Sequence, residues 1–275
     1  MKPIITIIII CITSLSIYPE TLNNHRNRID WIKGLIITEG KSAITINDNG
    51  NPADNESGNL ISYSTARDLS YQISKEKALL DAANVINDIY VYPDTKISDL
   101  IINYRELRQK ISHYMHEQSK FKETPSDHLN TSCILELKLG YLINTLGIRF
   151  PENDFPLRND IDISTKYTSV IIDTRGLKIK PALLPAIVNE AGLEVYNRFH
   201  ISGKSAVQHL AVSYTYNENE AVKHKKAGRH PFYCTAIKSL NGNPVISDDD
   251  IKRIYSHREN LAFLKKCRVI FIIDR

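Results

Sequence analysis

The stretch from Tyr63 to Tyr90 constrains the fold most, because it contains no glycine or proline. Apolar residues recur within it at the spacing of one helical face: Ala66, Leu69, Ile73, Leu80, Ala83 and Val85. This pattern predicts one long helix whose apolar side faces the protein core. Pro93 follows shortly afterwards, and we expect it to end the helix.

A second helical pattern and two strand patterns accompany this helix in the first half of the chain. Apolar residues at helical spacing from Ser98 to about Lys120 predict a helix with Ser98 as its N-cap. Residues 30–46 predict two strands, or one strand bent at Gly34 or Gly40. The early alternation of apolar and polar residues over 132–146 predicts a half-buried strand.

The second half of the chain mixes strand and helix patterns. We expect strands at residues 167–173, 183–188, 232–239 and 268–274, and helices at residues 203–209 and 247–266. Strands and helices do not alternate regularly, so we expect an α+β fold of two adjoining modules, with mixed sheets packed with two long helices. The modules are residues 25–146 and 167–275, joined by a linker at 147–166 that contains prolines and acids.

The first residues predict export from the cytoplasm. A positively charged start precedes an apolar run from Pro3 to Tyr18, which is short for a membrane span. Ser14 and Ser16 are small residues that fit a cleavage site, so we expect a signal peptide at residues 1–16. We therefore expect an exported protein without membrane insertion after cleavage; the periplasm as its compartment is what the resemblance described below implies.

Two alternatives to cleavage remain open. The apolar run could be an uncleaved anchor helix, or Cys11 could carry a lipid. The residues from Ile8 to Ile10 are bulky where a lipidation motif has small ones, and this disfavours the lipoprotein.

Charge and cysteine content exclude some classes of protein. The formal net charge of +4 is weak and evenly spread, so we expect no nucleic-acid partner. After processing, Cys133, Cys234 and Cys267 remain. Cys234 lies in a predicted strand and Cys267 just before another, which makes them a candidate disulfide; three buried free thiols are the alternative.

The sequence contains no phosphate-binding loop, nucleophile elbow or zinc-protease motif, and we expect no cofactor and no metal site. Asp173, Arg175 and Gly176 form the one local combination that invites a catalytic hypothesis, at the end of an apolar strand. A structural explanation is stronger, because glycine supplies the positive φ of a turn and aspartate accepts backbone hydrogen bonds. We therefore predict that these three residues form a structural turn.

The chain also resembles known families of exported proteins. The strand 31–37 and the helix sequence TARDLSYQISKEKALLDAANVI resemble the N-terminal module of the flagellar-assembly protein FlgT and of small envelope lipoproteins. The segments SVIIDTRGLKIKPALLPAIVNEAGLEVY and ENLAFLKKCRVIFIID resemble a region found beside such modules. The length, the signal peptide and the Ile/Asn/Lys-rich usage resemble the spirochaete flagellar coiling proteins, which coat the outside of the periplasmic flagellum.

The resemblance implies a non-enzymatic, flagellum-associated protein whose partners are other flagellar filament or sheath proteins and which supports filament shape and motility. It supplies no catalytic residues to carry over, and this chain lacks the lipidation motif of the lipoprotein members. The alternative function is a periplasmic hydrolase or ligand-binding protein with a site near Asp173 and Arg175.

Overall fold

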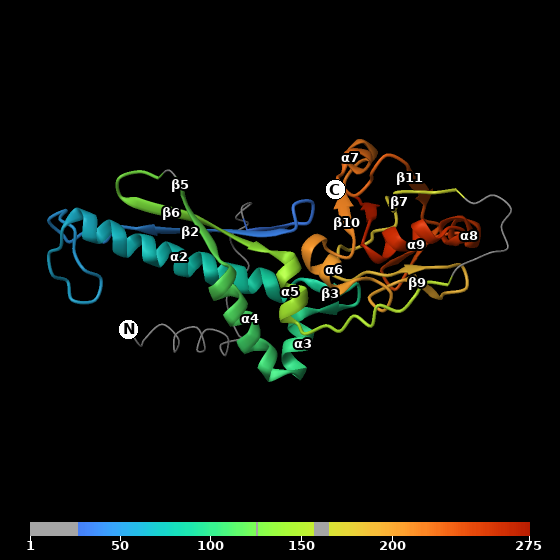
Figure 1. The fold of residues 1–275 in the computed structure, drawn as a ribbon. Coiled ribbons are helices and arrows are strands. Elements are labelled where there is room, and N and C mark those ends of the chain that lie inside the picture. Colours follow the sequence, from blue (N-terminus) through green and yellow to red (C-terminus); the bar gives the residue numbers. More distant parts are fainter. Residues whose placement is uncertain (1–26, 125, 157–164) are drawn as a thin grey trace.

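The computed structural model describes residues 27–124, 126–156 and 165–275. The predicted signal peptide and the middle of the predicted linker lie outside the described residues. The fold mixes helices with several sheets, which confirms the predicted α+β class. Figure 1 shows an elongated N-terminal half, built around one long helix, beside a rounder C-terminal half.

A four-stranded antiparallel sheet and the helix α2 form the N-terminal half, with strand order β1-β2-β6-β5 (Figure 1). Its elements are β1 (Arg28–Asp30), β2 (Leu35–Ala43), α2 (Tyr63–Asn87), β3 (Tyr90–Tyr92), β4 (Thr95–Lys96), α3 (Ile97–Asn103), α4 (Arg105–Gln118), β5 (Lys120–Thr124), β6 (Asn130–Lys138) and α5 (Leu139–Thr145). The long helix is therefore confirmed, and Ser62 caps it by accepting a hydrogen bond from the N–H of Thr65.

The buried face of α2 differs from the predicted one. Its buried residues recur every fourth position and are mostly small: Ala66, Ser70, Ser74, Ala78, Ala82 and Ile86. Leu69 and Leu80, predicted to be buried, are exposed instead. The reason is the short distance between helix and sheet, because only small side chains fit between two backbones in close contact.

Gly40 on β2 shows how close this contact is. A Cβ atom at this position would lie 1.8 Å from the carbonyl oxygen of Ser74 on α2. Hydrogen bonds join the same surfaces: Thr38 Oγ1 donates to the Ala78 carbonyl (2.8 Å), and Ser74 Oγ donates to the Thr131 carbonyl (3.1 Å). The strand is not divided or interrupted at Gly40, because β2 pairs with β6 continuously from Leu35 to Ala43.

The predicted second long helix is two helices. The chain leaves the helical conformation at Tyr104, with φ −130° and ψ 90°, between α3 and α4. The first of them starts after Lys96, not Ser98, and Asp99 accepts a hydrogen bond from the Lys96 N–H. The predicted strand at 132–146 is also divided, into β6 and the short helix α5.

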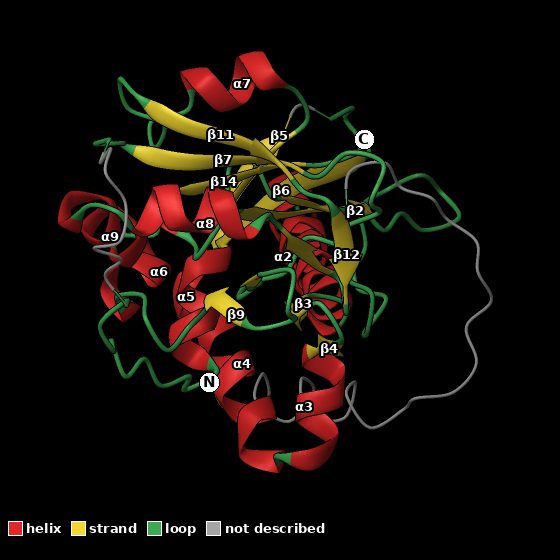
Figure 2. Cartoon of the chain, turned by 90° about the vertical axis from the view of Figure 1, so that its right-hand side faces the viewer, coloured by secondary structure: helices red, strands yellow, loops and turns green. Residues whose placement is uncertain are grey.

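A four-stranded parallel sheet in the order β10-β14-β7-β11 forms the centre of the C-terminal half (Figure 2). The elements of this half are β7 (Ser169–Asp173), β8 (Ile187–Val188), β9 (Glu194–Tyr196), α6 (Gly203–His209), β10 (Ser213–Thr215), α7 (Glu218–Lys223), β11 (Pro231–Thr235), β12 (Lys238–Leu240), β13 (Asn243–Val245), α8 (Asp248–Tyr255), α9 (Arg258–Lys265) and β14 (Val269–Ile272). A smaller sheet has the order β12-β13-β8-β9.

Both faces of the parallel sheet are covered, which explains the apolar sequences of its strands. Ala221 of α7 packs on one face, against Ile171 and Ile270. The buried side chains of α8 and α9 belong to the larger core cluster on the other face, together with Val170 and Phe271.

Three element predictions in this half need correction. The predicted strand at 183–188 is only Ile187–Val188, the one at 232–239 is divided into β11 and β12, and the helix at 247–266 is divided into α8 and α9. The second helix begins after His257, whose φ of −138° is extended and whose side chain accepts from the Glu259 N–H. The predicted N-cap of the first helix is confirmed, since Ser247 Oγ accepts from the Asp250 N–H at 3.1 Å.

The two halves share one core. A single cluster of buried side chains extends from α2 and β6 to β7, β14 and α9. Trp31 packs edge-on against Tyr214 with 5.4 Å between ring centroids, and the N–H of Leu183 donates to the Tyr90 carbonyl at 2.9 Å. The ends of the predicted linker are also packed, because Phe155 is buried against Tyr196. No helix among the described residues has the length and apolar character needed to cross a membrane.

Replacing Gly40 with alanine tests the helix–sheet contact. We expect Gly40→Ala to lower the free energy of unfolding by about 1–3 kcal/mol, because the added methyl group meets the rigid backbone of α2. Denaturant unfolding measures this change. Lys41→Arg is the matched control, since it lies next in the same strand, points away from α2 and keeps the positive charge beside the buried Glu39. Equal stability of the two variants would contradict the close contact.

Candidate functional site

Asp173 ends β7 at the carboxyl edge of the parallel sheet, the edge at which ligands bind in many sheets of this type. Its carboxylate accepts hydrogen bonds from the Arg175 N–H (3.1 Å), the Arg175 guanidinium Nε (2.8 Å) and the Tyr233 hydroxyl (3.1 Å). A second guanidinium nitrogen, Nη2, pairs with Asp173 Oδ2. The hydrogen bonds from Arg175 hold the pKa of Asp173 below its usual range.

Gly176 completes this turn. Its φ is +80°, a conformation that favours glycine, and its N–H donates to the Asp274 carboxylate at 3.1 Å. Thr174 Oγ1 donates to the Ile272 carbonyl at 2.7 Å. The structure thus brings the three predicted residues together in one turn, which links β7 to the end of β14.

These hydrogen bonds stabilise a turn, and they occupy the polar groups that a catalytic role for Asp173 would need. Asp173 is ionised and engaged by two neighbours, and burial raises the pKa of Tyr233 to about 12, so its hydroxyl stays protonated. A general base near neutral pH needs an accessible group with a pKa near the working pH. Tyr233 and Asp274 were not among the predicted residues of this turn; Tyr233 lies within the predicted strand 232–239, and Asp274 ends the predicted strand 268–274.

The candidate disulfide between Cys234 and Cys267 is wrong. All three cysteines of the described chain are buried free thiols. Cys234 lies on β11 and Cys267 precedes β14, and β7 lies between these two strands. Burial raises the pKa of both thiols, to about 11 for Cys267, so both are protonated at neutral pH.

One lysine of the basic run 223–229 is buried. Lys226 is only 5% exposed, and its Nζ donates to the Leu210 carbonyl at 3.1 Å. Leu210 itself has a φ of +62°. Burial lowers the pKa of Lys226 to about 7 and that of the neighbouring His224 to about 4. A short run of basic residues is typical of a solvated surface, and nothing in the local sequence distinguishes the buried lysine.

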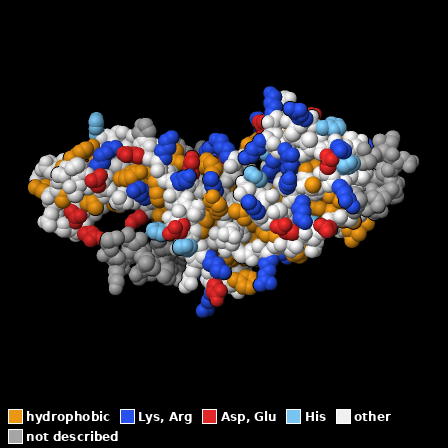
Figure 3. Space-filling model, viewed as in Figure 1, with side chains coloured by type: hydrophobic (Ala, Val, Ile, Leu, Met, Phe, Trp, Pro, Cys, Tyr) orange, Lys and Arg blue, Asp and Glu red, His pale blue; other side chains and the backbone are white. Residues whose placement is uncertain are grey.

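The face of the molecule in Figure 3 carries scattered charges, with many Lys and Arg side chains over the C-terminal half. Among the described residues no group of three His, Cys, Asp or Glu side chains could hold a metal ion. The Asp248–Asp250 run lies in the first turn of α8, where acids stabilise a helix N-terminus.

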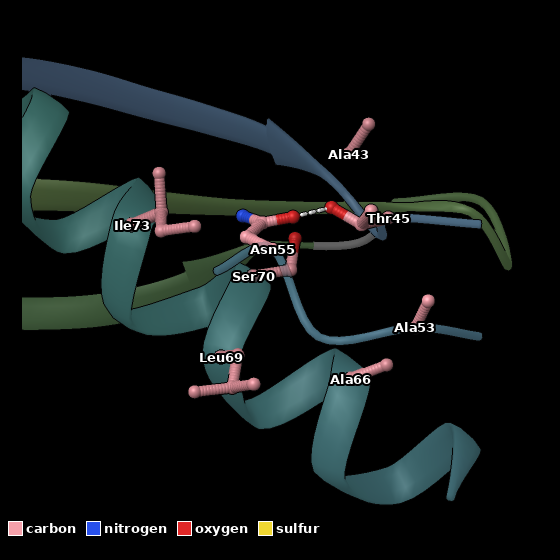
Figure 4. Close-up of a pocket in the computed structure, with 8 residues that line it drawn as sticks. All are labelled: Ala43, Thr45, Ala53, Asn55, Ala66, Leu69, Ser70 and Ile73. Carbon is pink, nitrogen blue, oxygen red and sulfur yellow. Dashed lines mark hydrogen bonds between the residues drawn. The ribbon is translucent and has the colours of Figure 1, made fainter. Parts of the chain in front are cut away.

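Two hollows lie on the N-terminal half, far along the chain from the predicted turn. One is a small cavity of about 10 Å³ between α2 and the end of β2, where Thr45 Oγ1 donates to Asn55 Oδ1 (Figure 4). This cavity has room for about one water molecule. The other is a cleft of about 280 Å³ along β2, lined by Glu39, Gly40, Lys41, Lys77, Leu80 and Asp81.

Comparison with known proteins gives a family match for the C-terminal half of the chain. Residues 169–275 match the family model described as Treponema pallidum Tp0624, second domain. This span runs from β7 to the end of the chain and is less than half of its 275 residues. The C-terminal half is therefore similar to a domain of a spirochaete protein. No curated protein matches the chain.

Two substitutions in the turn test which residue contributes more to stability. We expect Arg175→Ala to change the free energy of unfolding little, because the exposed guanidinium contributes little to stability. Gly176→Val should cost about 1–2 kcal/mol or more, because a β-branched residue resists a φ of +80°. Thermal unfolding of both variants measures this order. A larger loss in Arg175→Ala than in Gly176→Val would contradict it.

Lys226 should make stability depend on pH. Its folded pKa of about 7 lies below the unfolded value, so the unfolded chain binds more protons between about pH 7 and pH 10. Stability should therefore rise with pH across this window, by at most about 1.4 kcal/mol per pH unit. His224 titrates below this range in the folded state, and the buried Cys234 and Cys267 thiols, whose pKa is raised, oppose the rise only near and above pH 9.

Denaturant unfolding between pH 7 and pH 9 measures the slope in the wild-type chain and in Lys226→Met. Methionine keeps the apolar stem and removes the titrating amine, so the variant should lose most of the slope whatever its absolute stability. An unchanged slope would show that Lys226 is not the titrating group.

Proposed function

We propose that this protein is a non-enzymatic, exported protein of the spirochaete periplasm that associates with the flagellar filament or its sheath. In this proposal residues 25–146 are a FlgT-like module, and the chain is a counterpart of flagellar coiling protein B. It supports filament shape and motility through contacts with other filament or sheath proteins.

The observation that carries the proposal is the similarity of residues 169–275 to a domain of a spirochaete protein. This similarity suggests a spirochaete protein, and spirochaetes have periplasmic flagella. It agrees with the resemblance of the sequence to flagellar coiling proteins. The turn at Asp173 supports a role without catalysis, because its polar groups are engaged with one another.

Exposed apolar side chains support a role in protein contacts. Ile102 and Tyr104 are 78% and 64% exposed at the corner between α3 and α4, which projects from the molecule in Figure 1. Leu60 and Leu193 are 67% and 66% exposed on other loops. Neighbouring exposed apolar side chains, such as Ile102 and Tyr104, are typical of surfaces that bind proteins, whereas single ones such as Leu60 and Leu193 are common on any surface.

Cell fractionation tests the proposal. The protein should copurify with isolated periplasmic flagella, and its deletion should change filament curvature and swimming. Arg175→Ala should keep both flagellar association and filament shape. Recovery of the protein away from flagella would overturn the assembly role. Loss of function in Arg175→Ala with normal folding and association would favour a hydrolase or ligand-binding site at Asp173 and Arg175.

A further inference from the structure

The two halves of the chain carry opposite net charge. Residues 27–156 contain 18 Asp and Glu against 14 Lys and Arg, whereas residues 165–275 contain 10 Asp and Glu against 18 Lys and Arg. The net charge of +4 for the whole chain hides this asymmetry, which corrects the expectation of an evenly spread charge. The halves lie at opposite ends of an elongated molecule (Figure 1). Such an arrangement favours contact between one end of a molecule and the other end of the next.

Two loops and the start of α2 form the free end of the N-terminal half, at the left of Figure 1. One loop connects β2 to α2, and the other connects β5 to β6. The N–H of Ile44 donates to the Leu129 carbonyl at 2.7 Å, and the Tyr63 hydroxyl donates to a carbonyl of the β5–β6 loop. These bonds join the two loops into one surface. We call this end, residues 44–63 and 126–129, the tip.

The tip exposes four large apolar side chains. Leu60 is isolated within its own loop, but the fold brings three others to the same end of the molecule. Their exposed fractions are 48% for Ile46, 67% for Leu60, 44% for Tyr63 and 53% for Leu129. Figure 3 shows hydrophobic side chains at this end of the molecule, together with acidic ones. A group of apolar side chains held in water is typical of a binding surface.

Acidic side chains accompany the apolar group of the tip. Asp48 and Glu56 lie in the loop before α2, Asp127 lies in the loop before β6, and all three are exposed. Among the described residues the side chains of Asp48 and Glu56 pair with no Lys or Arg. Protein–protein interfaces combine an apolar centre with a polar rim. Because the rim of this surface is acidic, a basic partner surface fits it.

The C-terminal half carries a basic segment at the end of α7. No acidic residue occurs between Glu220 and Asp248. Val222 is 48% exposed on α7, and the residues that follow it include three exposed cations: Lys223, Lys225 and Arg229. In the described part of the chain none of these three cations pairs with an acid. We call residues 222–229 the basic segment.

Buried contacts fix the basic segment from beneath. The enclosed Lys226 donates from Nζ to the Leu210 carbonyl, and the Ala227 carbonyl accepts from Ser169 Oγ at 2.7 Å. The backbone between the exposed cations is therefore anchored to the core of the C-terminal half. A surface that is ordered before binding loses less conformational entropy on association.

We propose that the tip of one molecule docks on the basic segment of a second copy of this chain. The acids of the tip lie against the cations of the basic segment, and Val222 packs on the apolar group that contains Leu60. Figure 1 shows the tip and α7 on different halves of one molecule, so the contact joins two molecules. The proposal rests on the assembly role proposed above and names a contact through which copies of the protein associate.

This contact is small and depends on charge. Two loops and one short helix make a limited interface, so two isolated molecules associate weakly. Salt screens exposed charges over a Debye length of about 10 Å at 0.1 M, so added salt weakens the contact further. Repetition of a weak contact along a filament raises the overall strength of binding.

Sedimentation velocity of the purified protein over a series of concentrations tests the proposal. At about 20 mM salt the average sedimentation coefficient should rise with protein concentration, and at about 500 mM salt most of the rise should disappear. A sedimentation coefficient that stays constant with concentration at low salt would overturn the proposal.

Charge reversal identifies the two surfaces. Asp48→Lys with Glu56→Lys reverses the tip, and Lys223→Glu with Lys225→Glu reverses the basic segment. Each pair should weaken association at least about tenfold, because like charges then face each other. The chain with all four substitutions should associate again, since both surfaces have exchanged their charge.

A matched control separates local contact from net charge. Glu106→Lys with Glu117→Lys changes two exposed acids of α4 and raises the net charge by the same amount as the tip reversal. This variant should associate like the wild-type chain. Thermal unfolding checks that every variant is folded. If a reversal prevents folding, the neutral pair Asp48→Asn with Glu56→Gln should give a smaller loss in the same direction.

Two further results would contradict the proposal. Unchanged association in both reversed pairs would place the contact between copies elsewhere. Loss of association in each pair without recovery in the fourfold variant would show that the tip and the basic segment do not touch each other, and that the tip binds a different basic partner. All of these measurements use the purified protein and do not depend on copurification with flagella, so the two proposals can fail separately.

Discussion

The close contact between α2 and the sheet beneath it is the constraint on which the N-terminal half depends. Gly40 lets the backbones of β2 and α2 touch, and Ser70, Ser74 and Ala78 keep the helix side equally small. The buried hydroxyls hydrogen-bond across the contact, so their burial costs little. Because small side chains fill this interface, the larger apolar residues of α2 lie at its margins, where Leu80 borders the cleft beside β2.

The C-terminal half is packed differently, around a parallel sheet that is covered on both faces. Its parallel strands are buried on both faces, and the two central strands, β7 and β14, carry polar groups only at or beyond their ends. At the carboxyl edge these groups satisfy one another, since Asp173 binds Arg175 and Tyr233 while Asp274 binds the Gly176 N–H. A sheet edge that often binds ligands is here an internally paired turn.

Local signals in the sequence predicted many elements but fewer of their boundaries. The helix from Tyr63, the Ser247 cap and the turn glycine at 176 depend on neighbours a few residues away. The break between α3 and α4 at Tyr104 lies in a continuous helical pattern, and no glycine or proline marks it in the sequence. Likewise, the separation of Cys234 from Cys267 depends on β7 entering the sheet between their strands, which strand patterns alone do not specify.

The sequence by itself therefore determined the α+β class, the long helix and the glycine of the Asp173 turn, because short-range backbone preferences decide these features. Only the tertiary structure decided which face of α2 is buried and that Lys226 is enclosed. Each of these depends on distances between segments far apart in the chain. Residue types and their spacing do not predict how closely two backbone segments will approach each other.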